Sequence, residues 1–416
     1  MIAAAGPTVA YLSHWFPALS ERYVPQQIDA IRARGIGVLV IAVKQPLSSG
    51  FLREAAQYAA ECTYITPLRP RTLLLAILDC LRDAGKLRDI YARVLWGGRE
   101  NIPRRMKALM HTFLGAYLAR VLRGRATHIH ANHGYFPAWA AMVASRLTGI
   151  PYSLTLHGSD LLVDQIYIDL KARNACFVVT ISDFNKRFLL DRVPGLPSER
   201  VVVNRLGIDP NGSRELVGRR QEGSRPFVIL TVGRLHAVKN QEFLLEACRL
   251  LADDGLEFVC RIVGAGPTEK SLAAKIERLQ LGNRVTLAGN MPSADVAREY
   301  ERADLFVLTS RSEGLPIVLI EAMSHGVPVL APAITGIPEL VTDGLTGALY
   351  TPNDLDDLVA RIRAAATLSE MERDLLRRRA RERVLADYDG TINTAEFAKL
   401  FETPCSAAPV RVGRGD

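Results

Sequence analysis

Cysteine is scarce in this 416-residue sequence, and its spacing excludes two common uses of the residue. No two cysteines form a Cys-x-x-Cys pair, and none has the His/Cys spacing of a ligand set. Disulfide frameworks and structural zinc sites depend on such spacings. We therefore expect reduced thiols, as in a cytosolic protein, at Cys62, Cys80, Cys176, Cys248, Cys260 and Cys405.

Long hydrophobic runs and a secretory signal are also missing. The apolar run Leu73–Leu78 is far shorter than the ~20 residues that a membrane-spanning helix needs. The first residues, Met1–Pro7, have no basic n-region, which a signal peptide would carry. We expect a soluble, cytoplasmic chain that can still lie on a membrane surface.

Two nucleotide-binding signatures are absent as well. No Gly-x4-Gly-Lys-Ser/Thr loop occurs, and the turn Gly264-Ala265-Gly266-Pro267 lacks the third glycine of a dinucleotide fingerprint. P-loop enzymes and dehydrogenases are therefore disfavoured. The turn still follows a strand pattern and opens a helix at its proline, so Gly264 and Gly266 stay among the candidate ligand-binding residues.

The composition that is present, 48% hydrophobic and 23% charged, is that of an ordinary folded protein. It excludes a mostly disordered or fibrous chain. Short apolar runs alternate with helical patterns, which is typical of doubly wound parallel sheets in the α/β class. The expected strands are Val9–Ser13, Gly37–Val43, Thr127–His130, Tyr152–Leu156, Cys176–Ile181, Val201–Val203, Phe227–Val232, Phe258–Val263, Arg284–Leu287, Asp304–Leu308 and Val327–Ala331.

The length predicts two comparable domains or three smaller ones, because single cores seldom exceed about 200 residues. The alternating pattern and the number of expected strands favour two Rossmann-like domains. A polar, Gly-rich stretch at 207–225 is typical of a linker. It separates a domain over 1–206 from one over 226–388. A helix over 389–403 is expected to pack back on the first domain, and 404–416 to form a tail. Two such domains would face each other across a cleft at the carboxyl ends of their strands, where ligands bind.

Positive charge is concentrated in the first third of the chain. Residues 1–130 carry 18 basic and 8 acidic side chains, or +10, whereas the whole chain carries +8. Residues 69–125 alone hold 13 basic and 4 acidic side chains, interleaved with leucine and isoleucine. Basic amphipathic helices are typical of membrane-surface elements; the alternative is a solvated face over a helical insertion. Nucleic acid is disfavoured, because no stacking platform accompanies the charge.

A turn over Thr231–Asn240 follows a strong strand pattern and opens a helix. Gly233 permits a tight turn, while Arg234 and Lys239 flank the helix start. Helix N-termini favour anions, so two cations there suit a diphosphate. The alternative is a turn with two solvated cations.

Two glutamates lie eight residues apart around a predicted helix start. Glu313 precedes Gly314, Leu315 and Pro316, and Glu321 lies among apolar residues of the helix. A carboxylate in such surroundings is costly unless it is hydrogen-bonded, and a ribose diol would satisfy it. The alternative is that Glu313 caps the helix and Glu321 faces water.

Histidines end two of the expected strands. His157 precedes Gly158, which allows close approach of a ligand, although a lone histidine is more often structural. Alternation places His128 and His130 on one face of a strand. No carboxylate or cysteine accompanies them, so a metal site is disfavoured.

Together, Gly233-Arg234, Lys239, the Glu313-x7-Glu321 pair and the following Ala322–Val329 resemble the family 4 retaining glycosyltransferases of the GT-B fold. The resemblance continues almost without a break through Asp343–Gly347. It implies an enzyme that needs neither metal nor cofactor, with a C-terminal domain that binds a UDP- or GDP-sugar. The matching Arg and Lys would hold the diphosphate, Glu313 the donor sugar, and Glu321 the ribose.

The resemblance also assigns roles in the N-terminal domain. His157 matches a histidine that faces the donor sugar, and the histidine-rich strand end at His133 borders the acceptor cleft. Phe16-Pro17-Ala18-Leu19-Ser20-Glu21 resembles a loop of bacterial exopolysaccharide transferases of the colanic-acid type, but Arg22 and Tyr23 depart from the commoner Thr-Phe. Ser20 and Glu21 could bind an acceptor hydroxyl or cap the helix that follows.

The resemblance implies a retaining hexosyltransferase that acts on a lipid-linked glycan in polysaccharide biosynthesis, and the basic helices add the expectation that it lies on the inner face of the plasma membrane. The anionic membrane surface would be a partner of the basic helices. Two alternatives remain open: a nucleotide-sugar epimerase of the same two-domain fold, and a non-catalytic sugar-nucleotide-binding protein.

Overall fold

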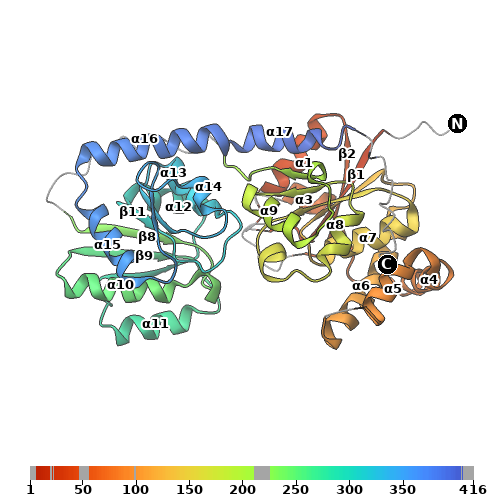
Figure 1. The fold of residues 1–416 in the computed structure, drawn as a ribbon, viewed down its shortest axis with the longest axis horizontal. Coiled ribbons are helices and arrows are strands. Elements are labelled where there is room, and N and C mark those ends of the chain that lie inside the picture. Colours follow the sequence, from red (N-terminus) through yellow and green to blue (C-terminus); the bar gives the residue numbers. More distant parts are fainter. Residues whose placement is uncertain are drawn as a thin grey trace. The chain divides into compact units, whose positions relative to one another are not determined.

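The computed structural model describes residues 6–18, 21, 23–45, 56–97, 100–209, 225–403 and 405. Two compact units divide the chain. Unit 1 comprises residues 1–204 and 392–416, and unit 2 comprises residues 205–391. Each unit contains one parallel sheet with helices packed against it (Figure 1), which confirms the predicted α/β class.

Unit 1 contains a seven-stranded sheet in the order β3-β2-β1-β4-β5-β6-β7. The strands are β1 (Thr8–Trp15), β2 (Gly37–Lys44), β3 (Thr63–Tyr64), β4 (His128–Asn132), β5 (Tyr152–Leu156), β6 (Val178–Thr180) and β7 (Val201–Val203). Its helices are α1 (Tyr23–Ala33), α3 (Ala56–Glu61), α4 (Pro70–Arg82), α5 (Arg88–Leu95), α6 (Ile102–Leu122), α7 (Phe136–Thr148), α8 (Ile168–Asn174) and α9 (Asp183–Arg192).

Unit 2 contains a six-stranded sheet in the order β10-β9-β8-β11-β12-β13. The strands are β8 (Phe227–Val232), β9 (Phe258–Val263), β10 (Val285–Gly289), β11 (Leu305–Val307), β12 (Val329–Pro332) and β13 (Ala348–Tyr350). Its helices are α10 (Gln241–Asp253), α11 (Glu269–Arg278), α12 (Ser293–Arg302), α13 (Ile317–Ser324), α14 (Ile337–Leu340), α15 (Leu355–Ala366) and α16 (Glu370–Asp387). Helix α17 (Gly390–Lys399) crosses the division between the units.

Local sequence explains where these elements begin and end. Every residue of β5 is buried, as expected for a parallel strand covered on both faces. Helix α7 has Pro137 in its first turn and ends at Gly149, whose φ of 79° is easily adopted only without a side chain. Helix α16 begins with a reciprocal capping box between Ser369 and Glu372.

In each sheet the strand order reverses at one point, and ligands of doubly wound sheets bind there, beyond the carboxyl ends of the strands. In unit 1 the reversal lies between β1 and β4, which end at Trp15 and Asn132. In unit 2 it lies between β8 and β11, which end at Val232 and Val307. Glu21, His133, Lys239 and Glu313 follow these four strand ends, whereas His157 follows β5 and Gly264 follows β9.

The prediction for the cysteines is wrong at one pair. Cys176 and Cys405 form a disulfide, with their Cα atoms 6.1 Å apart. The two residues are 229 positions apart, so no local spacing could have revealed the pair. Cys62, Cys80, Cys248 and Cys260 are free.

Candidate active site

In unit 2, the turn after β8 is fixed by backbone contacts with the turn after β9. The Gly233 N–H donates to the Val263 carbonyl at 2.9 Å, and the Leu235 N–H to the Ala265 carbonyl at 3.0 Å. A Cβ atom on Gly264 would overlap the carbonyl oxygen of Gly233. The predicted turn therefore needs glycine for the close approach of two backbones.

Gly266 is constrained in the same way, because a Cβ there would overlap the Leu235 carbonyl. Both glycines thus have a structural role that the sequence pattern alone did not reveal. They hold the Arg234 turn in place, and the Arg234 side chain extends from it into solvent. The Arg234 carbonyl accepts a hydrogen bond from Gln241 Nε2 at 3.2 Å.

The structure brings Lys239 and Glu313 together across the strand-order reversal. Lys239 Nζ lies 2.6 Å from Glu313 Oε1, and both side chains are mostly buried. Thr309 donates to the Lys239 carbonyl at 3.1 Å, and Thr335 donates to the Glu313 carbonyl at 2.6 Å. Both backbone positions are therefore anchored, so the ammonium and the carboxylate are held at the start of α13.

Glu313 is followed by three buried residues, Gly314, Leu315 and Pro316. Helix α13 begins one residue later than predicted, at Ile317. Glu321 lies farther along this helix and is half-buried. Its Oε2 accepts a hydrogen bond from the Tyr300 hydroxyl at 3.1 Å, so this carboxylate has a protein partner already.

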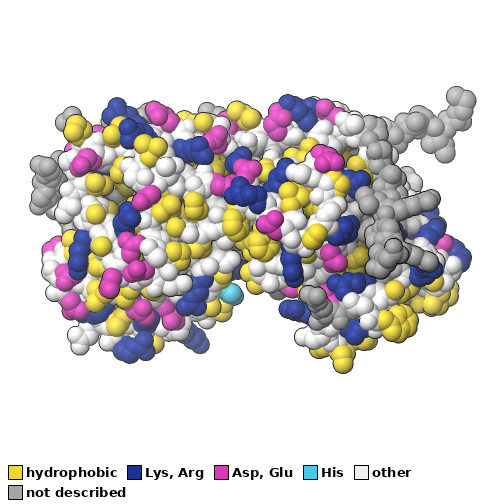
Figure 2. Space-filling model, in the orientation of Figure 1, with side chains coloured by type: hydrophobic (Ala, Val, Ile, Leu, Met, Phe, Trp, Pro, Cys, Tyr) yellow, Lys and Arg dark blue, Asp and Glu magenta, His cyan; other side chains and the backbone are white. Residues whose placement is uncertain are grey.

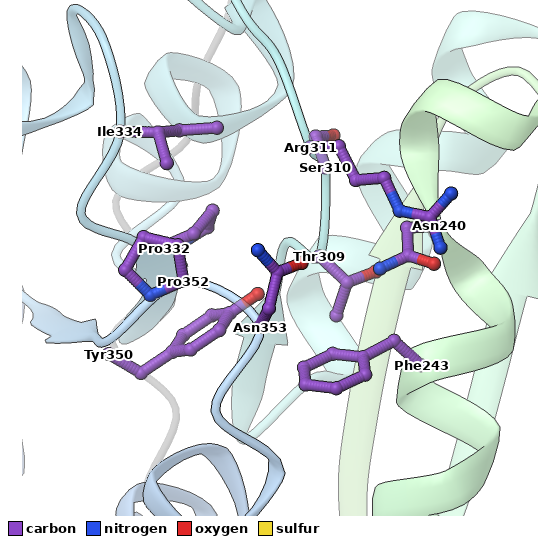
Figure 3. Close-up of a pocket in the computed structure, with 10 residues that line it drawn as sticks. All are labelled: Asn240, Phe243, Thr309, Ser310, Arg311, Pro332, Ile334, Tyr350, Pro352 and Asn353. Carbon is purple, nitrogen blue, oxygen red and sulfur yellow. The ribbon is translucent and has the colours of Figure 1, made fainter.

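A small cavity lies beside Asn240, at the ends of β11, β12 and β13 (Figure 3). Its volume is about 90 Å³. The Arg311 side chain points toward Asn240, and Asn353 lies between Tyr350 and Thr309 (Figure 3). The remaining lining residues are Phe243, Ser310, Pro332, Ile334 and Pro352. The cavity could not be identified from the sequence, because its lining comes from four segments that are far apart in the chain.

In unit 1, His133 lies between two carboxylates. Its Nε2 is 2.9 Å from Glu21 Oε1, and its Nδ1 is 3.5 Å from Asp160 Oδ2. Burial alone would lower the pKa of His133, but the hydrogen bonds to Asp160 and Glu21 outweigh it and raise that pKa to about 10. His133 is therefore an imidazolium at neutral pH. Its φ of 96° is unusual for a residue with a side chain.

His157 is held in the opposite protonation state. Burial, followed by the charge of His133, lowers the pKa of His157 to about 3. Its Nε2 lies 2.8 Å from Asn132 Oδ1 and 3.2 Å from the Tyr23 hydroxyl. His157 is thus a neutral imidazole fixed by two neighbours.

Asp160 connects the two histidines and was not predicted. Its Oδ1 accepts from the His157 N–H at 3.0 Å, and its Oδ2 from the Gly134 N–H at 2.8 Å. Against the effect of burial, the hydrogen bond and charge of His133 lower the pKa of Asp160. The signal was an aspartate three residues after a strand-end histidine, which is also the pattern of an ordinary helix start. Asn132 and Tyr23 were missed as well. Ser20, the other predicted acceptor residue, lies outside the described residues.

His128 and His130 do lie on one face of β4, as predicted. Both rings are hydrogen-bonded to Ser153 Oγ, at 2.7 and 2.9 Å, and both pack against Phe401. Within the described part of the chain, no group of three or more His, Cys, Asp or Glu residues is arranged to hold a metal ion. The two histidines therefore belong to the core.

Two family models match the chain and together span most of it. The model described as "Glycosyltransferase Family 4" matches residues 20–211, and "Glycosyl transferases group 1" matches residues 214–383. The first match covers most of unit 1 and the second covers most of unit 2.

Similar curated proteins include WcaL of Escherichia coli K12, named for colanic acid biosynthesis, which is 29% identical over 93% of this chain and 97% of its own length. The amylovoran biosynthesis glycosyltransferase AmsK of Erwinia amylovora is 32% identical over 50% of this chain and 52% of its own. The alpha-D-kanosaminyltransferase of Streptomyces kanamyceticus is 30% identical over 58% of this chain and 68% of its own.

Solved structures share the fold. A glycosyltransferase from Rickettsia africae has a TM-score of 0.70 at 17% identity, over 97% of this chain and 99% of its own. Anabaena HepE in complex with UDP has a TM-score of 0.69 at 20% identity, over 95% of this chain and 99% of its own.

Proposed function

Because the chain belongs to the family 4 glycosyltransferases, with a GT-B-like fold, we propose that it transfers a sugar from a nucleotide-diphosphate donor to a lipid-linked glycan. The names of WcaL and AmsK support a role in exopolysaccharide biosynthesis. The relatives reported above are transferases, which disfavours the epimerase and the non-catalytic binding protein.

The observation that carries the donor site is the Lys239–Glu313 pair at the strand-order reversal of unit 2. A donor diphosphate would bring two negative charges to Lys239, Arg234 and the start of α13, where such charges are favoured. Lys239 would then exchange its carboxylate partner for the phosphate oxygens. Glu313 would be released to accept hydrogen bonds from hydroxyl groups of the donor sugar.

Glu321 would hold the ribose, and the base would be uracil or guanine. The Glu321 carboxylate accepts one hydrogen bond from Tyr300. Because a carboxylate has about four lone-pair positions, Glu321 can still accept hydrogen bonds from the ribose hydroxyls. The protein cations would take the place of a divalent metal. We propose, accordingly, that neither metal nor cofactor is needed.

Transfer would proceed with retention at the anomeric carbon. The bond from this carbon to the phosphate oxygen breaks, a bond to the acceptor oxygen forms on the same face, and the acceptor proton passes to the departing phosphate. This route needs no protein base, which agrees with a neutral His157 whose pKa is too low for it to be charged. His157 would instead orient the donor sugar by hydrogen bonding.

A lipid-linked acceptor would require the enzyme to work at a membrane. Unit 1 has a protein surface that could bind one. Six apolar side chains on α4 and α6 are exposed, at the helical spacing that forms a stripe on each helix. They form what we call the α4–α6 surface: Leu74, Leu78, Leu81, Ile102, Met106 and Met110.

Hydrophobic side chains gather over these helices beside Lys and Arg (Figure 2). The opposite faces of α4 and α6 supply the core of unit 1 through Ala76, Cys80 and Ala108, so the exposed stripes are additional to that core. No helix among the described residues could span a bilayer. We propose peripheral attachment through the α4–α6 surface to anionic lipid.

The test is incorporation of label from a panel of labelled UDP- and GDP-sugars into the lipid fraction of membranes mixed with the enzyme. We expect label from one sugar nucleotide in the lipid fraction, with or without a chelator. Donor consumption without any acceptor would favour an epimerase, and binding without turnover would favour the non-catalytic alternative. A strict requirement for a divalent metal would contradict the metal-independent route.

A further inference from the structure

A second group of basic side chains belongs to unit 1 and lies at the ends of β1 and β2. His14 and Trp15 end β1, and Lys44 ends β2, paired in register with Trp15. Lys44 Nζ lies 5.7 Å from the centre of the Trp15 ring. Lys44 and Trp15 are both exposed, whereas His14 is half-buried.

Helix α6 adds two more basic groups to the same place. Lys107 and His111 are one turn apart, so their side chains lie on one face of the helix. The His111 and His14 rings both meet the Phe136 ring edge-on, at centroid distances of 4.6 and 6.2 Å. Phe136 therefore holds the two imidazoles close to one another. We call Lys44, His14, Lys107 and His111 the basic cluster.

Little negative charge from the described residues compensates the basic cluster. Among the described residues, neither Lys44 nor Lys107 forms a salt bridge. Glu21 is the one carboxylate with a resolved effect on His14, and its oxygens already bind His133 and Asn132. Other charged groups that face the cluster, Lys171 and His133, add positive charge.

The neighbouring positive charges help to lower the pKa of both histidines in the cluster. Burial, followed by the charges of Lys107, His14 and Lys171, lowers the pKa of His111 to about 4. Burial, followed mainly by Lys44, also lowers the pKa of His14. An anion bound here would remove this repulsion and would let the imidazoles donate hydrogen bonds.

We propose that the basic cluster binds the diphosphate of the lipid-linked acceptor. This inference rests on the proposed function and assigns to that acceptor a charged group and its binding residues. Lys44 and Lys107 act as point charges on the phosphates. The exposed Trp15 ring beside them offers a stacking face for the first sugar of the glycan.

The position of the cluster on α6 agrees with a lipid source for the anion. Met106 and Met110, part of the α4–α6 surface, flank Lys107 along the helix. The same helix therefore offers apolar side chains for a lipid chain and cations for its phosphates. A lipid diphosphate would meet both at once.

The test compares acceptors with and without phosphate in the Lys44→Ala/Lys107→Ala variant. Each charge-assisted hydrogen bond lost costs roughly 10-fold in affinity or more, so we expect the KM for the lipid diphosphate acceptor to rise about 10- to 100-fold. The KM for the donor, and turnover on a glycan acceptor without phosphate, should match the parent protein. Arg123→Ala removes an exposed charge at the C-terminal end of α6. This control should leave the acceptor KM, the donor KM and turnover unchanged. An unchanged acceptor KM, or an equal loss on the neutral acceptor, would overturn the proposal.

A binding measurement keeps this inference separate from the proposed function. Inorganic pyrophosphate is titrated into the Lys239→Ala protein, whose donor site is weakened, and into the same protein with Lys44→Ala/Lys107→Ala added. Binding that is lost with the two lysines supports the cluster even if no sugar is ever transferred. Equal binding by both proteins, or binding by neither, refutes the cluster without touching the donor assignment.

Discussion

The two units present polar groups at their strand-order reversals in opposite ways. Unit 1 has a network of buried groups around His133, His157 and Asp160, and each group has fixed protein partners. Unit 2 has an exposed Arg234 and an ion pair between Lys239 and Glu313. The first network is complete without a ligand, whereas the second holds charges that a ligand could take over.

This difference assigns different kinds of work to the units. A network with its protonation states already set can position a neutral reacting group, because no side chain has to move or titrate. An ion pair whose partners can be exchanged suits a charged ligand that arrives and leaves. The basic cluster of unit 1 also suits a charged ligand, although for another reason: among the described residues its two lysines form no salt bridge that a ligand would have to displace. Substitutions in the exchangeable pair of unit 2 should therefore reduce sugar transfer, whereas substitutions in the buried network of unit 1 should also reduce stability.

The largest effect is expected at Lys239. Removing one donor that stabilises developing charge typically costs about 10²- to 10³-fold in rate, so Lys239→Ala should reduce sugar transfer by that order. Initial rates with a labelled donor measure the loss. Lys270→Ala, an exposed lysine on α11, is the matched control and should leave the rate unchanged. A Lys239→Ala enzyme with near-normal turnover would remove the donor assignment.

Asp160→Asn should reduce stability as well as activity. The change leaves the His133 imidazolium with Glu21 alone and weakens the acceptor for two backbone N–H groups. Breaking a buried ion pair in this way costs about 3 kcal/mol. Urea unfolding followed by the fluorescence of Trp139, which is buried in unit 1, measures the change. Glu299→Gln, which breaks the Arg261 pair of unit 2, should leave this transition in place; a shift as large as that of Asp160→Asn would contradict the assignment.

Acid should unfold unit 1 before unit 2. The pKa values of His128 and His111 are lowered to about 4, first by burial, and that of His157 to about 3. Below pH 6.5 these imidazoles bind protons in the unfolded chain but stay neutral in the folded chain. The free energy of unfolding therefore decreases as the pH falls from 6.5 toward 4. His133 works in the other direction only at high pH, where its contribution is lost as the pH rises toward 10.

Thermal unfolding at pH 7.5, 5.5 and 4.5 measures this effect. In unit 2, His325 also has a lowered pKa, so a smaller decline is expected there. Conversion of His128 to Asn should flatten the unit 1 decline. Parallel loss of both transitions at every pH would argue against the histidines as its cause.

The smallest effect is expected at the α4–α6 surface. Insertion of one apolar side chain contributes about 1.5 kcal/mol or more, so Met106→Glu should weaken binding to anionic vesicles roughly tenfold. Co-sedimentation with vesicles that contain anionic lipid measures it. Met371→Glu changes an exposed methionine of unit 2 and should have no effect. Equal binding by all three proteins would exclude this surface from membrane contact.

Much of the fold followed from local sequence because parallel strands are apolar along their whole length. Tyr152–Leu156 and Phe258–Val263 have the predicted ends. Strands β3 and β13 were missed, since two or three residues such as Thr63–Tyr64 are too few for a pattern. The pairing of Cys176 with Cys405 was missed because it depends on the tertiary fold alone.

The candidate site followed from sequence where one motif carries the chemistry, as around Glu313. What could not be predicted is which partners these groups find. Lys239 and Glu313 are 74 residues apart, and their contact arises from two adjacent strands. The pKa of His133 likewise depends on its hydrogen bonds to Asp160 and Glu21, and that of His157 on burial and the charge of His133.

The division of work between the units is tested most directly by calorimetric titration of the donor sugar nucleotide into three proteins: the parent, Lys239→Ala and His157→Ala. We predict that Lys239→Ala loses affinity at least tenfold, while His157→Ala binds the donor with nearly parental affinity and transfers poorly. Full donor affinity in Lys239→Ala, or its loss in His157→Ala alone, would contradict the assignment of donor binding to unit 2.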